Sequence, residues 1–151
     1  MDLRRLIGSG DRIGLFTLPF VVVGVIANIA YPTVFQVGGP PTWLSWLSVG
    51  ILVPGLAIWL WSVILILTNV PRGRLITDGP YRWVKHPLYT AVAILVLPWA
   101  GFLLDTWLGV VIGAVLYMAS RIYAPAEEAE LARTFGETWR AYSSSVKFQW
   151  L

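Results

Sequence analysis

Long apolar runs alternate with short polar segments along the chain, and this pattern predicts membrane-spanning helices. A helix that crosses the hydrocarbon core of a bilayer needs about 20 mostly apolar residues. Four runs meet this requirement, at 13–31, 44–68, 88–104 and 106–123. Little more than Asp105 separates the last two runs, so we expect them to form a tight antiparallel hairpin. The pattern therefore predicts an all-α integral membrane protein with four transmembrane helices.

The segment after the fourth run has a different character and predicts a helix that begins at Pro125. Proline followed by Glu127 and Glu128 is typical of a helix start. A stripe then recurs at helical spacing, at Leu131, Phe135, Thr138 or Trp139, and Tyr142. We expect an amphipathic cytoplasmic helix of about five turns, on the membrane or on the bundle. Gly136 costs about 1 kcal/mol relative to alanine there, which suggests a close backbone approach.

The basic residues of the chain fall in three places. They are Arg4, Arg5 and Arg12 before the first run, Arg72, Arg74, Arg82 and Lys85 between the second and third, and Arg121, Arg133, Arg140 and Lys147 at or beyond the end of the fourth. None lies in the segment 32–43 or at Asp105. Because cytoplasmic loops carry the excess of Lys and Arg, we expect both termini and the loop 69–87 to face the cytoplasm.

The composition agrees with a membrane protein and excludes several kinds of site. Hydrophobic residues make up 57% of the chain and charged residues 13%, about half of the roughly 25% typical of soluble domains. There is no cysteine, which excludes disulfides, thiolate nucleophiles and cysteine metal sites. The single histidine excludes multi-histidine zinc or haem ligation. We expect neither a metal ion nor a nucleic acid as partner.

The loop sequence GPYRWVKHPLY, residues 79–89, is the first polar segment that could carry chemistry. Its prolines stiffen it, and Pro87 is well placed for the first turn of the third helix. His86 then lies at a helix N-terminus, where free amides favour a carboxylate. Arg82 and Lys85 add positive charge. The loop is either a basic patch that binds anionic lipid headgroups or one half of a ligand site.

The acidic pair Glu127-Glu128 is the second such segment, and the predicted topology places it on the same side of the membrane. Acids in a first helical turn commonly complement the helix dipole, which stabilises the helix by about 0.3–1 kcal/mol per residue. They can also bind an ammonium group or the two hydroxyls of a ribose. A loop that favours a carboxylate beside such acids suits an amino-acid-bearing nucleoside, such as S-adenosylmethionine.

The two segments together resemble the isoprenylcysteine carboxyl methyltransferase family, which is related to the phospholipid N-methyltransferases. The first motif, Gly-Pro-Tyr-Arg-x-x-(Arg/Lys)-His-Pro-x-Tyr, matches 79–89. The second, Glu-Glu-x-x-Leu-x-x-x-Phe-Gly, matches 127–136 and is followed by Tyr142. The resemblance covers about residues 69–151. The sequence departs from the family pattern at Ala91, where glycine is usual, and at Trp139, where tyrosine is usual.

The resemblance implies a methyltransferase that uses S-adenosylmethionine, releases S-adenosylhomocysteine and acts on a lipophilic or membrane-embedded acceptor. It implies a division into an N-terminal part, 1–68, with the first two spans, and a methyltransferase core, 69–151. The cofactor-binding residues it implies are Tyr81, Arg82, His86, Pro87, Tyr89, Glu127 and Glu128. Arg121, at the cytoplasmic end of the fourth run, is the remaining cation that we expect to orient the acceptor.

Two other functions stay open at this point. One is a non-enzymatic membrane protein whose basic loop binds anionic lipid. The other is a membrane reductase related to sterol reductases. The sequence does not tell whether the acceptor is a carboxylate, a thiol or an amine, and it leaves the oligomeric state unknown. In either enzyme class the expected partners are membrane lipids and a lipophilic substrate.

Overall fold

The computed structural model describes residues 10–148. Arg4 and Arg5, on which part of the predicted orientation depends, lie outside this range. The structure is 82% helical, and residues 10–148 contain no strand beyond one isolated bridge between Gln36 and Thr106. The predicted all-α class is therefore confirmed.

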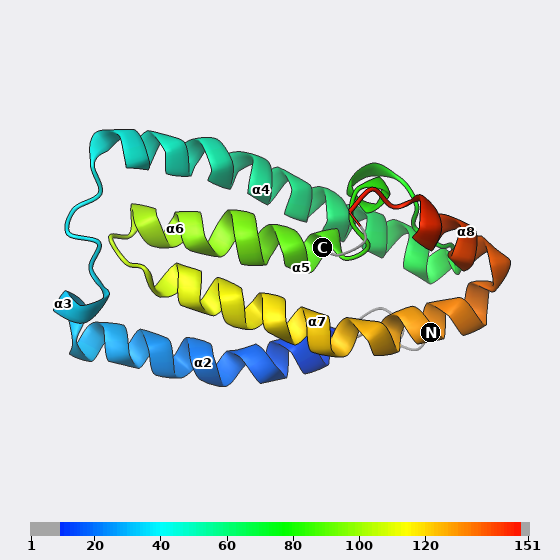
Figure 1. Ribbon diagram of the computed structural model, residues 1–151, viewed down its shortest axis with the longest axis horizontal. Coiled ribbons are helices and arrows are strands. Elements are labelled where there is room, and N and C mark those ends of the chain that lie inside the picture. Colours follow the sequence, from blue (N-terminus) through cyan, green and yellow to red (C-terminus); the bar gives the residue numbers. More distant parts are fainter. Residues whose placement is uncertain (1–9, 149–151) are drawn as a thin grey trace.

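The helices lie side by side in one layer, as Figure 1 shows. In chain order the elements are α2 (Gly10–Ala30), α3 (Pro32–Phe35), α4 (Thr42–Asn69), η1 (Val70–Arg72), η2 (Gly79–Arg82), α5 (Pro87–Thr90), η3 (Ala91–Val96), α6 (Leu97–Leu103), α7 (Leu108–Phe135) and α8 (Glu137–Ser145). The continuous helix α5–η3–α6 packs between α4 and α7, and α2 packs on the other side of α7. The last two runs thus form the antiparallel hairpin that the sequence predicts.

Three helices are long and apolar enough to cross a membrane: Gly10–Ala30, Thr42–Arg72 and Leu108–Phe135. They contain the second predicted run in full and all but one or two residues of the first and fourth runs. The third run corresponds to the apolar helix Pro87–Leu103, which is shorter than these. Four spans and their orientation therefore stay a prediction, while the three candidate spans are present.

The helix Pro87–Leu103 contains a π-helical segment, η3, which ends at Val96, two residues before Pro98. At its end the amide of Leu97 donates to the carbonyl of Val92 instead of to the carbonyl four residues back. Proline has no amide hydrogen to donate, and a local π-helical turn is one of the ways in which apolar helices accommodate it. The irregular turn therefore reconciles Pro98 with a continuous helix.

Glycines let the helices of the layer approach one another closely. A Cβ atom added to Gly109 would lie 2.0 Å from the carbonyl oxygen of Leu97, and one added to Gly113 would lie 2.3 Å from that of Ala93. On the other side of the hairpin, a Cβ atom added to Gly55 would lie 2.6 Å from the Cβ of Leu95. Small residues at helix contacts are typical of helix packing in membranes.

The prediction of a helix that begins at Pro125 is wrong, because α7 continues through this proline to Phe135. Proline removes one helical hydrogen bond but does not have to end a helix. The chain turns instead at Gly136, whose φ of 52° and ψ of −121° favour glycine. No atom lies within 4 Å of a Cβ added there. The expected close backbone approach at Gly136 is therefore also wrong.

The turn at Gly136 brings the short helix α8 back over the loop 69–87 (Figure 1). This helix is amphipathic, as the sequence predicts, since Trp139 and Tyr142 are buried whereas Arg140 is exposed. With Val146, these two side chains form a small core that packs against Leu75, Tyr81, Leu131, Ala132 and Phe135. The amphipathic segment thus packs on the protein itself. Its location in the cytoplasm stays a prediction.

At the opposite end of the layer, the connector 31–41 crosses the turn between α6 and α7 (Figure 1). Asp105 forms this turn with a φ of 53°. Its side chain accepts a hydrogen bond of 2.9 Å from the amide of Gly39. The indole nitrogen of Trp107 donates to the carbonyl of Val34, also at 2.9 Å. These contacts fix the path by which the chain passes from α2, on one edge of the layer, to α4 on the other.

Candidate active site

A pocket of about 250 Å³, which we call the motif pocket, lies where α5 begins beside α7. Its lining residues are Lys85, His86, Thr90, Ser120, Arg121, Ala124, Pro125 and Glu128. Across it, Glu128 binds two residues of the loop. Its Oε2 accepts a hydrogen bond of 2.8 Å from the Nζ of Lys85, and its Oε1 lies 3.3 Å from the Nε2 of His86. The two sequence motifs therefore meet at this pocket.

Local backbone geometry explains this meeting. His86 is the residue before the helix α5, and Pro87, fully buried, is the first residue within it. The proline fixes the start of the helix and restricts the backbone conformation of His86, the residue before it. On α7, Arg121, Ala124 and Glu128 are three and four residues apart and so share one face. A single helical face and a single helix start therefore supply most of the pocket.

The electrostatics of the pocket centre on Glu128, which lies beyond the apolar section of α7. The hydrogen bond with His86 lowers the pKa of this carboxyl, desolvation opposes that effect, and Lys85 lowers the pKa further. The net shift is well below the ordinary value, so Glu128 is a carboxylate at neutral pH. The pocket thus combines an ionised acid with the cationic side chains of Lys85 and Arg121.

The structure brings three of the predicted site residues, His86, Arg121 and Glu128, to the motif pocket. Two more lie next to it. The ring of Tyr89 is 6.4 Å from that of His86 between centroids, and Pro87 is buried at the helix start. Arg121 therefore lies beside the residues expected to bind the cofactor.

Neither Tyr81 nor Glu127 lines the pocket, and Tyr81 packs against the neighbouring core under α8. The hydroxyl of Tyr142 donates to the carbonyl of Tyr81 at 2.9 Å. Burial raises the pKa of the Tyr81 hydroxyl, and the negative charge of Glu127 adds to this effect. Tyr81 therefore joins the loop to the core under α8, outside the lining of the pocket.

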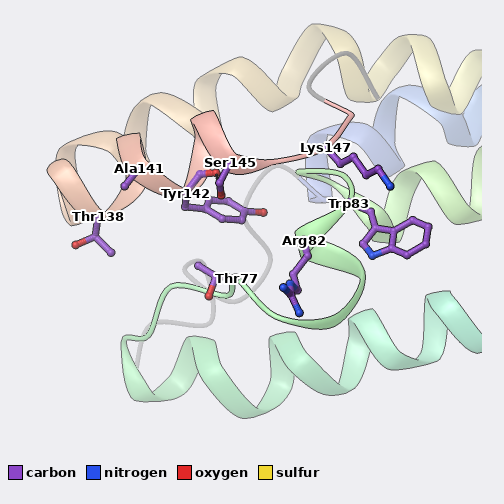
Figure 2. A pocket seen from close by; sticks show the side chains of 8 residues that line it. All are labelled: Thr77, Arg82, Trp83, Thr138, Ala141, Tyr142, Ser145 and Lys147. Atoms are coloured by element: carbon purple, nitrogen blue, oxygen red, sulfur yellow. Dashed lines mark hydrogen bonds between the residues drawn. The ribbon is translucent and has the colours of Figure 1, made fainter.

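Arg82 lies in a different cavity, a groove of about 710 Å³ between η2 and α8. Figure 2 shows its side chain in this groove, together with Trp83 and residues of α8. None of the residues that line the groove also lines the motif pocket. The structure therefore divides the loop motif between two cavities.

Sequence reasoning did not predict five lining residues of the motif pocket as site residues, namely the polar Lys85, Thr90 and Ser120 and the apolar Ala124 and Pro125. Lys85 occupies the Arg/Lys position of the first motif, and this match was the signal that could have identified it. Thr90 and Ser120 carry no such signal, because hydroxyl residues are common in apolar helices. Within residues 10–148, no group of three or more acidic or histidine residues could hold a metal ion.

Comparison with known proteins gives one match. The sequence profile described as "Isoprenylcysteine carboxyl methyltransferase (ICMT) family" matches residues 50–133, more than half of the chain. No curated protein and no solved structure matches the chain significantly. The matched range begins within α4 and contains the loop, the hairpin and all residues of the motif pocket. With its three candidate membrane spans, the chain belongs to the isoprenylcysteine carboxyl methyltransferase family, a family of membrane methyltransferases.

Proposed function

We propose that the chain transfers a methyl group from S-adenosylmethionine to a lipophilic acceptor, and that the motif pocket binds the amino-acid end of this cofactor. The observation that carries the proposal is the contact of Glu128 with Lys85 and His86, 43 and 42 residues away in the sequence. Family membership supports the reaction type. The contact supports the location, because it joins both motifs of the family at one pocket.

The residues of the pocket suit a zwitterion. Lys85 is complementary to a carboxylate, and Glu128 to an ammonium group. The pocket volume of about 250 Å³ is below the roughly 300–1,000 Å³ of most small-molecule sites. The fit is therefore to the amino-acid end, and the rest of the cofactor has to extend beyond this cavity.

S-adenosylmethionine supplies an electrophilic methyl group on a positively charged sulfur. The contribution of this chain is to align the two reactants, because in-line displacement depends mainly on geometry. Glu128 exchanges its bond with Lys85 for one with the ligand's ammonium, and Lys85 becomes available to the ligand's carboxylate. Arg121 orients the acceptor. A carboxylate or thiolate acceptor needs no general base, whereas an amine has to arrive neutral.

The proposed topology follows from the distribution of basic residues. It has four spans, with Pro87–Leu103 as the third, and both termini in the cytoplasm. The cofactor then reaches the motif pocket from the cytoplasm. The acceptor arrives from the bilayer, between helices of the layer. Cysteine labelling of engineered single-cysteine variants would test this directly, because the natural chain has no cysteine. Labelling of position 37 from the cytoplasmic side would contradict it.

Calorimetric titration of the detergent-purified protein with S-adenosylhomocysteine tests the site. We expect the wild type to bind, and Glu128→Gln and His86→Ala each to weaken binding about tenfold or more, because a charge-assisted hydrogen bond is lost. Glu130→Gln is the matched control, since Glu130 is exposed on the same helix, and it should bind like the wild type. Circular dichroism checks that each variant folds.

The outcomes separate the competing functions. Absence of binding by the wild type would contradict the methyltransferase proposal, and tight binding of NADPH instead would favour a reductase. Unchanged binding by both Glu128→Gln and His86→Ala would contradict the proposed site while leaving the reaction type standing.

A further inference from the structure

The groove between η2 and α8 is larger than the motif pocket and shares no lining residue with it. Its volume is about 710 Å³. Figure 2 shows Trp83, on the loop side, close to Lys147 of the segment after α8, and shows the side chain of Arg82 pointing away from Lys147, toward α4. Two backbone hydrogen bonds join the two sides. The shorter runs from the amide of Phe148 to the carbonyl of Trp83, at 2.8 Å. The groove is thus a defined surface with its own walls.

The residues that line this groove carry a net positive charge. Its lining contains Arg82 and Lys147 and no acidic residue. Within residues 10–148, the guanidinium of Arg82 forms no hydrogen bond and no ion pair. Lys147 lies over the ring of Trp83, with Nζ 5.5 Å from the ring centroid. Glu137 adjoins the groove in sequence but pairs with Arg140. Two cations without acidic partners favour an anionic ligand.

The other groups of the groove are neutral and polar. The hydroxyls of Thr77, Thr138 and Ser145 line it and can donate to oxygen atoms of a ligand. Arginine, with its planar fork of donors, binds a phosphate group through two parallel hydrogen bonds. The set of donors therefore suits a phosphate group that carries further hydroxyl or ester oxygens.

The position of the groove indicates the source of this phosphate. The wall formed by η2 packs beside the last turns of α4, since a Cβ atom added to Gly79 would lie 2.9 Å from the ring of Trp61. The groove is therefore at the level where the apolar helix α4 ends. Trp83 is 60% exposed there. An exposed tryptophan beside basic residues is typical of the headgroup region of a membrane. A lipid phosphate is present at this level at high local concentration.

We propose that this groove binds the headgroup of an anionic glycerophospholipid, with Arg82 as the phosphate ligand and with Lys147 and Trp83 beside the rest of the headgroup. The bound lipid bridges η2 and the segment after α8, and so fastens α8 over the loop that carries His86. Arg82 then serves the lipid rather than the methyl donor. The inference is independent of the proposed function, because none of its residues lines the motif pocket.

Titration of the protein, purified in an uncharged detergent, with dihexanoyl phosphatidylglycerol tests the proposal by calorimetry. We expect saturable binding that the double variant Arg82→Gln/Lys147→Gln weakens about tenfold or more. The double variant Arg72→Gln/Arg133→Gln removes the same charge from two exposed positions outside the groove and should bind like the wild type. Equal weakening in both double variants would show that lipid binding depends only on the net charge of the protein, and would overturn the proposal.

Two further titrations identify the ligand. Inorganic phosphate and dihexanoyl phosphatidylcholine should each bind more weakly than phosphatidylglycerol, and phosphate that binds as tightly as the lipid would overturn the headgroup assignment. S-adenosylhomocysteine should bind Lys147→Gln and Arg82→Gln alike. Loss of its binding in Arg82→Gln alone would return Arg82 to the cofactor site and overturn the proposal, without touching the role proposed for Glu128.

Discussion

At the connector end of the helix layer, where residues 31–41 cross the turn between α6 and α7, polar side chains bind backbone groups. Asp105 accepts from the amide of Gly39, and Trp107 donates to the carbonyl of Val34. At the pocket end, beside the loop 69–87, charged side chains bind one another, as Glu128 does with Lys85 and His86. At the connector end, polar side chains form hydrogen bonds with backbone groups of the turn. At the pocket end, charged side chains line open cavities.

The difference distinguishes polar residues that the fold requires from those that a ligand explains. A turn at the end of apolar helices has backbone groups that need partners, and single side chains such as Asp105 and Trp107 supply them without pairing with another charge. An ion pair beside a cavity is only weak evidence for stability. The charged side chains at the pocket end therefore indicate ligand binding. Substitutions at the connector end should change the free energy of unfolding, and substitutions at the pocket end should change ligand binding.

The largest effect on stability is expected from Gly109→Val, at the start of α7 near the connector end. A Cβ atom there would lie 2.0 Å from the carbonyl oxygen of Leu97, so the hairpin has to separate. We expect a loss of about 3 kcal/mol in the free energy of unfolding, measured in mixed micelles with increasing denaturing detergent. Gly50→Val is the control, because no atom lies within 4 Å of its added Cβ. Equal losses in both variants would show that helix contact is not the cause.

A smaller effect is expected from Asp105, which tests the connector end itself. Asp105→Ala removes the acceptor for the amide of Gly39 and places alanine at a φ of 53°, so unfolding should become easier by about 1 kcal/mol. Asp105→Gly should lose less, since glycine tolerates this φ, and Asp105→Asn least, since it keeps an oxygen acceptor. Binding of S-adenosylhomocysteine should stay unchanged in all three. A variant that keeps its stability but loses this binding would break the comparison of the two ends.

The smallest effect is expected from pH at the pocket end. The pKa of Glu128 is lowered in the folded protein, mainly by His86 and also by Lys85. A lowered pKa stabilises the folded state above the ordinary value of 4.5, and this contribution is lost as the pH falls through the lowered value. The wild type should therefore lose more stability than Glu128→Gln between neutral pH and pH values below 4.5. Parallel pH profiles would contradict the ion pairing of Glu128.

Much of the helical architecture could be read from the apolar runs, because a span of hydrocarbon thickness leaves a long and simple signal. The break expected at Pro125 was wrong, since the residues of α7 on either side of the proline keep their helical bonds and packing. At Gly136 the sequence showed a glycine in a helix but not whether space or backbone conformation required it. The structure shows that backbone conformation requires the glycine, because its φ is positive and no atom lies within 4 Å of an added Cβ.

The sequence by itself determined that the chain is an α-helical membrane protein, and its two motifs already indicated the family and the pairing of the loop with the acidic helix face. Only the tertiary structure decided which motif residues share a cavity. Arg82 and His86 are four residues apart, yet they line different cavities. The reason is physical: between η2 and Pro87 the loop follows no regular helix or strand, so sequence spacing does not predict the direction of a side chain. That direction is set by the contacts of the loop with α7 and α8.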